Sequence, residues 1–293
     1  MTSFDPTPLI AGALAAFWCT IIRLDVRDHR VVTTDGMIYL QAGRGEPVPR
    51  PFSRRWLLPR VLGDRVLRWD IASTAAMIAC GPLVAAYTGG AMWQRLAACC
   101  LFLGCPGIFR MNVACPVHVD PIGHALALAA ALCAPHHPVI AVALSLAGGG
   151  CVERAPVFAA IFAWNPWLLL GLLAPAWRRI AAPATEPWLT RPFRYALERH
   201  RGSWLAWREM LMPWGALALL MPLGAALDLP TVIAIAALAV GYGQMFIATD
   251  RARLYQWAAP AVIAVAVRAL PDSSLTVAIV VVHLFNPYRL YGI

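Results

Sequence analysis

Asp35 is the first residue whose type and setting indicate chemistry, because it lies in an arginine-rich stretch, residues 31–60, between two apolar runs. A carboxylate within hydrogen-bond reach of a substrate hydroxyl can act as a general base. Thr33 or Thr34 could cap a helix here, which would place Asp35 in its first turn, where the helix dipole favours a negative charge. Tyr39, four residues later, would share a helix face with Asp35. A purely structural role as a first-turn acid is the alternative.

Further acids and bases stand at the edges of later apolar runs, as His118 with Asp120 and Glu153 with Arg154. A charge in the middle of a bilayer costs about 2.5–3.5 kcal/mol or more, so such residues gather at membrane edges and in cavities, which are often functional. Each pair also has a structural interpretation. Asp120 precedes Pro121 at the start of an apolar run, and Glu153 and Arg154 can neutralise each other.

These residues are set in a chain that is 60% hydrophobic and only 13% charged, about half the charged fraction of a soluble domain. Apolar blocks occur at residues 7–22, 70–88, 91–109, 119–134, 137–150, 155–177, 207–227, 230–248, 256–270 and 275–286. Several are shorter than the roughly 20 residues that cross a bilayer upright, so some are expected to be broken or re-entrant. We predict an all-α, polytopic transmembrane helical bundle of about 8–10 spans, formed as a single integral membrane domain over residues 1–293 and multi-pass in the membrane. The first run is expected to be an uncleaved span.

Every one of the 24 basic residues is an arginine, and the net charge is +9. A basic chain is often a nucleic-acid binder, but here the arginines fall between apolar blocks, which indicates membrane surface and lipid phosphate as partners and no nucleic acid. Two loops hold most of them, the first loop (residues 23–69) and the second loop (residues 178–208). Because both are rich in arginine, the positive-inside rule does not orient the chain by itself. The second loop has the larger excess of arginine over acid, so we place it in the cytoplasm and the first loop outside.

Within the first loop, Pro47, Pro49 and Pro51 forbid a helix, so an extended segment is expected after the helix that carries Asp35. Residues 53–69 then resume as an amphipathic, interfacial helix with apolar side chains towards lipid and arginines towards the headgroups.

The ordered set of these motifs resembles a family. Asp35 with Tyr39, followed by "PFSRRWLLP" at residues 51–59, is similar to the first-loop signature of small bacterial GT-C-type membrane glycosyltransferases of the mannosyltransferase-like kind. "HVDPIGHALALAAAL", "ERAPVFAAIFAWNP" and "TDRARLYQWAAP" resemble later elements of the same group. The resemblance covers residues 8–175 and 248–262. The paired acidic motif that such proteins carry in the first loop is missing here.

This resemblance implies a GT-C-like fold and a hexosyl or mannosyl transfer from a polyprenyl-phosphate sugar to an extracytoplasmic acceptor at the cell envelope, in a bacterial plasma membrane. Asp35 and Asp120 would be the catalytic acids. The donor phosphate and lipid would be bound by Arg54, Arg55, Arg60, Tyr39 and Trp56. Supporting roles would fall to His118, Glu153, Arg154, Asp250 and Arg253.

Two other functions stay open. The missing acidic pair favours a non-catalytic subunit that binds lipid or glycolipid, and a broken helix at "AWNPW" would suit a transporter. We expect no resident cofactor and no metal; a divalent ion between Asp35 and Asp120 is the alternative, although two carboxylates are few ligands. The eight cysteines lie mostly in apolar runs, where cysteine behaves as a small hydrophobe.

Overall fold

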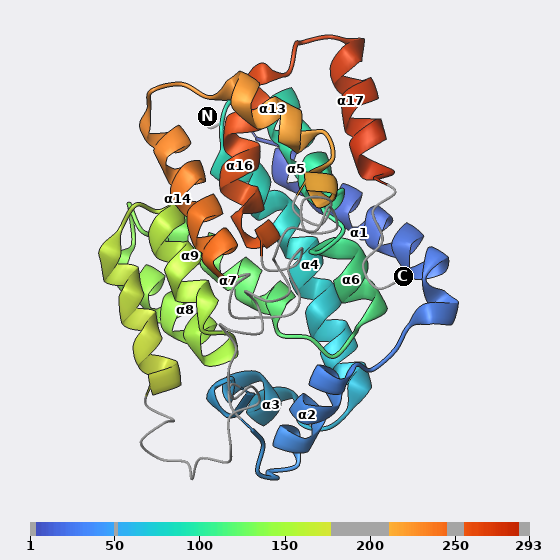
Figure 1. Ribbon diagram of the computed structural model, residues 1–293, viewed down its shortest axis with the longest axis vertical. Coiled ribbons are helices and arrows are strands. Elements are labelled where there is room, and N and C mark those ends of the chain that lie inside the picture. Colours follow the sequence, from blue (N-terminus) through green and yellow to red (C-terminus); the bar gives the residue numbers. More distant parts are fainter. Residues whose placement is uncertain (1–3, 50–51, 177–210, 245–254, 287–293) are drawn as a thin grey trace, which may run out of the picture. The chain divides into compact units, whose positions relative to one another are not determined.

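The computed structural model describes residues 4–49, 52–176, 211–244 and 255–286, and within these ranges every regular element is a helix (Figure 1). This confirms the all-α prediction for the described part of the chain. The whole second loop, residues 178–208, lies outside these ranges, as do Asp250 and Arg253. The predictions made for them stay predictions.

Among the described residues, two helices have the length and hydropathy to cross a bilayer, α1 (Thr7–Asp25) and α4 (Val66–Thr88). At about 1.5 Å per residue they extend for roughly 28 and 34 Å. Only 28% and 33% of their most apolar windows are buried within the protein, and large side chains such as Leu9, Phe17 and Ile71 are more than 60% exposed. These helices therefore turn much of their apolar surface outward, unlike the core helices of a soluble domain.

The other predicted runs correspond to shorter helices, so the count of spans stays a prediction. They are α5 (Met92–Leu103), α6 (Phe109–Ala114), α7 (Asp120–Cys133), α8 (Pro138–Cys151), α9 (Arg154–Phe162), η3 (Pro166–Leu172), η4 (Met212–Trp214), α13 (Leu217–Gly224), α14 (Leu229–Gln244), η5 (Gln256–Ala258), α16 (Ala259–Ala266), η6 (Val267–Ala269) and α17 (Ser274–Leu284).

The predicted runs at 91–109 and 155–177 are both broken. The run at 91–109 ends as a helix at Leu103, because a buried turn containing Pro106 and Gly107 follows it. The run at 155–177 breaks at Trp164, whose φ of 49° is left-handed. Asn165 then caps η3 by accepting a hydrogen bond from the Trp167 backbone N–H at 3.0 Å. This second break was expected from "AWNPW".

The described residues group into two compact units that are interleaved in sequence. Unit 1 draws on Met1–Ile21, Gly81–Met111 and Arg191–Ile293, and unit 2 on Ile22–Cys80 and Asn112–Thr190. In unit 1, the buried Gln256 side chain accepts from the Gly107 N–H at 2.7 Å and donates to the Pro213 carbonyl at 2.6 Å. The His283 ring bonds the Leu101 carbonyl at 2.8 Å. These bonds satisfy the backbone where α5 ends.

In unit 2, α7, α8 and α9 pack on one another, and η3 packs against α8 and α9. Glycines allow the close approach of η3 to α8, since a Cβ on Gly149 would overlap the Gly171 backbone. Ser145 also donates to the Leu168 carbonyl at 2.6 Å. The end of α8 supports the first loop, because Leu57 of α3 (Leu57–Leu62) fills the space above Gly150.

The first loop contains α2 (Thr34–Gly43), η2 (Phe52–Arg54) and α3. Thr33 caps α2 by accepting from the Gly36 N–H at 3.2 Å, as predicted. The proline-containing stretch after it is not helical through residue 49, also as predicted. The expected single amphipathic segment over 53–69 is instead interrupted at Gly63, whose φ is +69°, and its last residues belong to α4.

Candidate functional site

The N-terminal end of α2 is held against the segment that leads into α7. Arg30 Nε donates to the Val113 carbonyl at 3.1 Å, and the Val31 N–H donates to the Ala114 carbonyl at 3.0 Å. Gly36 lies so close to Val117 that an added Cβ would come within 3.2 Å of its carbonyl oxygen. The start of α2, which carries Asp35, is consequently placed against residues 113–117, directly before the turn that carries His118 and Asp120.

Asp35 is half-buried and, within the described residues, forms neither a hydrogen bond nor an ion pair. Asp120, by contrast, is 1% exposed. Both carboxylates act electrostatically on the same buried group, the Tyr39 phenol. The two acids that the resemblance nominated are therefore both close enough to Tyr39 to act on its phenol.

Asp120 begins α7 among basic groups. One carboxylate oxygen lies 3.6 Å from Arg154 Nη2, and the other lies 3.7 Å from His118 Nδ1. Arg154 itself is 8% exposed and begins α9. His124, one helical turn after Asp120 and 1% exposed, completes this buried group. Sequence reasoning missed His124, although its spacing of four residues from Asp120 on an expected helix was a usable signal.

A second group, here called the Arg55 clamp, ties the first loop to the turn between α8 and α9. Arg55 Nε donates to Glu153 Oε2 at 2.9 Å, and Arg55 Nη1 donates to the Tyr39 hydroxyl at 2.6 Å. The guanidinium also lies 5.6 Å from the centre of the Phe52 ring, within the range of a cation–π contact. Tyr39 is fully buried between Phe52, at 5.3 Å between ring centres, and Trp69, at 5.7 Å.

The electrostatics of the clamp follow from these contacts. Burial raises the pKa of Tyr39 to about 12, so its hydroxyl keeps its proton. Burial would lower the pKa of Arg55, but Glu153 and Tyr39 outweigh it and raise the pKa well above its ordinary value. Burial would likewise raise the pKa of Glu153, yet Arg55 is the main cause that holds that pKa below its ordinary value. The clamp thus contains an ionised pair.

A third group joins the start of the first loop to the start of α4. Asp70 Oδ1 accepts from both Arg23 Nη2 and Arg30 Nη2, each at 2.7 Å. Arg23 also donates to the Thr74 hydroxyl at 2.9 Å. Sequence reasoning missed Asp70, because it counts as the first residue of an apolar run. Two of the loop's arginines are therefore engaged by Asp70 in the fold itself.

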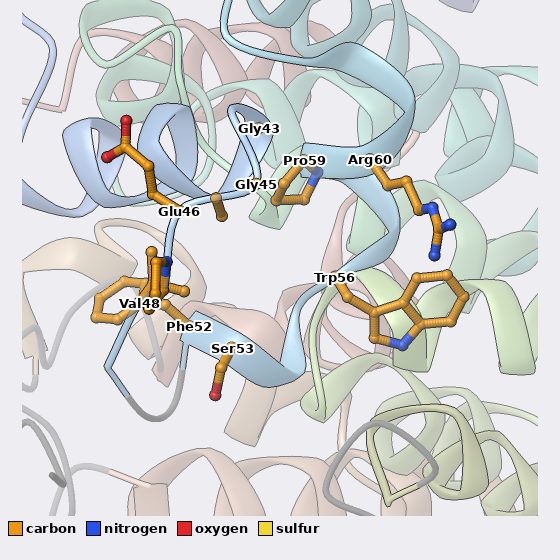
Figure 2. A pocket seen from close by; sticks show the side chains of 11 residues that line it. Gly43, Gly45, Glu46, Val48, Phe52, Ser53, Trp56, Pro59 and Arg60 are labelled. Atoms are coloured by element: carbon orange, nitrogen blue, oxygen red, sulfur yellow. The ribbon is translucent and has the colours of Figure 1, made fainter. Parts of the chain in front are cut away.

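The remaining part of the first loop encloses a cavity of about 520 Å³ between the C-terminal end of α2 and α3 (Figure 2). Gly43, Gly45 and Pro59 lie along one side of it, Val48 and Phe52 along another, and Trp56 with Arg60 opposite them. The Glu46 side chain points away from the opening, towards Arg44, with which it pairs at 2.6 Å.

The five residues expected to bind the donor are thus divided between two places. Tyr39 and Arg55 belong to the clamp, whereas Trp56 and Arg60 line the cavity. Arg54 lies in η2, next to Arg55. Of the supporting residues, His118, Glu153 and Arg154 lie in the two buried groups.

No group of three or more His, Cys, Asp or Glu side chains is arranged to hold a metal ion among the residues that the structure describes. The chemistry that these residues can perform is proton transfer at the half-buried Asp35, while Arg55 and Arg154 are fixed positive charges of the two buried groups. No family model, curated protein or solved structure matches this chain, so the functional argument is carried by its residues.

Proposed function

We propose that this protein is a membrane glycosyltransferase that moves a sugar from a polyprenyl-phosphate carrier to an acceptor hydroxyl, with Asp35 as the general base. The observation that carries the proposal is the half-buried Asp35 carboxylate, which has no hydrogen bond or ion pair in the described structure and whose neighbour Gly36 packs against Val117, in the segment that leads to Asp120. An unengaged carboxylate at the edge of a buried charged cluster can accept a proton from a substrate.

The other two acids of the site are less suited to that role. Asp120 is buried and lies within 4 Å of both Arg154 and His118. Glu153 already accepts a hydrogen bond from Arg55. Both are better read as groups that hold the arginines and the local charge in place.

The reaction would be a single displacement at the anomeric carbon of the sugar. The acceptor oxygen forms a bond to the anomeric carbon, while the bond from that carbon to the phosphate oxygen breaks and its electron pair leaves with the polyprenyl phosphate. The hydroxyl proton passes to Asp35. Arg55 and Arg154, kept in position by Glu153 and Asp120, would be the fixed cations that stabilise the charge developing on the phosphate, since preorganised charge stabilises a transition state.

The exposed apolar side chains of the protein are consistent with a lipid-linked substrate. Beyond α1 and α4, exposed large apolar side chains recur on α13, α14 and α17, for example Leu223, Ile235 and Val282, which are 74%, 56% and 70% exposed. Soluble monomers seldom expose extended apolar surface. We accordingly place the protein in a membrane as a multi-pass chain, with the first loop at headgroup level on the extracytoplasmic side.

The test is an Asp35→Asn variant. Purified protein in detergent is incubated with short-chain polyprenyl-phosphate hexoses, and the release of prenyl phosphate is measured, because this product is common to every acceptor. We expect the rate to fall by about 10²–10⁴-fold, the usual contribution of general-base catalysis. Asp28→Asn serves as the control, since Asp28 is an acid of the same loop with 80% of its side chain exposed.

An unchanged rate in Asp35→Asn would contradict the proposal. The main alternative is a non-catalytic subunit that binds a glycolipid, and one observation favours it: two of the three acids at the site have arginine neighbours, which leaves Asp35 alone. In that case native mass spectrometry would detect bound polyprenyl-phosphate hexose on the wild type, with no prenyl phosphate released.

A further inference from the structure

The cavity of the first loop lies at the opposite end of α2 from Asp35. Ala42 and Gly43, at the end of the helix, line it. Asp35, Tyr39 and Ala42 are spaced by four and three residues, so they follow one stripe of the helix. The cavity and Asp35 are therefore on the same face of α2, and Phe52 is a wall of the cavity that also packs on Tyr39.

The distance between them restricts what the cavity can hold. Seven helical residues separate Asp35 from Ala42, which is about 10 Å along the axis. In a reacting complex the attacking oxygen must approach the anomeric carbon to about 3–3.5 Å. The donor phosphate is bonded to that same carbon, so it lies within one sugar ring of the base. A phosphate in the cavity would be farther away than this.

The walls of the cavity suit a sugar. The Trp56 indole is fixed by the hydrogen bond from its Nε1 to the Ala174 carbonyl at 3.2 Å, and its ring borders the opening (Figure 2). The Ser53 hydroxyl has no hydrogen bond among the described residues, and exposed Arg60 has no ion pair among them. An aromatic wall meets the C–H face of a pyranose ring, while a hydroxyl and a guanidinium bond its oxygens, as in pockets that combine apolar surface with a few polar groups.

Gly45 lines the cavity. Its φ of +79° is left-handed, a conformation that favours glycine, and no atom lies within 4 Å of the position a Cβ would take, so the space beside it is open. The cavity is thus roomy at its rim and mixed in polarity at its walls.

We infer that this cavity is a subsite for the distal sugars of an extended acceptor, so that the acceptor is an oligosaccharide rather than a single sugar or a small alcohol. The inference rests on the proposed function, because it takes the acceptor hydroxyl to react at Asp35. One sugar at Asp35 and one or two more along α2 would span the separation and bring the last ring onto Trp56.

The test measures binding without turnover. Fluorescently labelled wild-type protein in detergent is applied to a glycan array that holds neutral and acidic glycans from one to six sugars. We expect binding to glycans of three or more sugars and at least tenfold weaker binding to monosaccharides. Trp56→Ala should lower binding to the long glycans at least tenfold, whereas Trp167→Ala, which removes a tryptophan that is 70% exposed on η3, should leave binding unchanged.

Ser53→Tyr provides a second route, since it fills the cavity and keeps the Trp56 hydrogen bond. It should abolish binding of the long glycans in protein that elutes as the wild type does on size exclusion. Asp35→Asn should bind glycans as the wild type does, so a failure of catalysis is distinguishable from a failure of this subsite. Absence of glycan binding, equal binding of short and long glycans, or wild-type binding by Ser53→Tyr would overturn the inference.

Discussion

The Arg55 clamp should contribute much more to stability than the exposed ion pairs of the same loop. The side chains of Arg55 and Glu153 are only 12% and 26% exposed, respectively. Replacing Arg55 by Met would leave the Glu153 carboxylate without the cation that holds its charge, and would remove the donor to the Tyr39 hydroxyl. Breaking one side of a buried pair costs about 3–5 kcal/mol.

Water can reach part of Glu153, so we reduce that figure to about 2–3 kcal/mol for Arg55→Met. The double variant Arg55→Met, Glu153→Gln removes both charges. Its loss in the free energy of unfolding should be smaller, by at least about 1 kcal/mol, than the sum of the losses in Arg55→Met and in Glu153→Gln. The matched control is Arg44→Met. It breaks the Arg44–Glu46 pair, whose atoms are 2.6 Å apart but whose side chains are 42% and 47% exposed, and should cost less than about 1 kcal/mol.

The assay is unfolding of the purified protein in detergent, followed by near-ultraviolet circular dichroism for the wild type, the two single variants, the double variant and the control. The reasoning is refuted if Arg55→Met proves no more destabilising than Arg44→Met. It is also refuted if the coupling energy between Arg55 and Glu153 in the double-mutant cycle is below about 0.5 kcal/mol, because the clamp would then stabilise no more than an exposed ion pair. Release of prenyl phosphate by the same variants should fall together with their stability, because the clamp positions α2 and with it Asp35.

Two further outcomes follow from the same contacts. Arg55, acting against the effect of burial, holds the Glu153 pKa below its ordinary value. A carboxyl whose pKa is lowered on folding contributes its full stabilisation above the pKa of the unfolded chain, about 4.5 for Glu, and loses it as the pH falls below that value. The difference in melting temperature between the wild type and Glu153→Gln should therefore narrow from pH 7 to pH 3.5. A constant gap would show that the pair is not ionised. Gly43→Ala should destabilise the protein by about 1–3 kcal/mol, because its Cβ would overlap the Gly63 backbone, whereas Gly12→Ala, with open space around the Cβ, should have little effect on the melting temperature.

Much of the local structure was predictable from the residues themselves. The Thr33 cap and the helix after it, the non-helical prolines and the break before Pro166 depend on side-chain and backbone chemistry within a few residues. The apolar runs predicted most helices, but not their ends. The break after Leu103 depends on Gln256, about 150 residues away, which satisfies the turn at Gly107, and no local pattern announces such a partner.

In the candidate site, too, the local features were predictable from the sequence and the long-range contacts were not. The sequence alone determined that Asp35 and Tyr39 share a helix face and that acids and bases stand at the ends of apolar runs, because helical periodicity and the cost of burying charge act locally. Only the tertiary structure decided which charges meet. It paired Arg55 with Glu153 across 98 residues and gave Arg23 and Arg30 to Asp70. It left Asp35 unengaged among the described residues and separated Trp56 and Arg60 from it by the length of α2. An arginine's partner depends on which acid the packing of helices brings within reach, and that packing is a property of the whole fold.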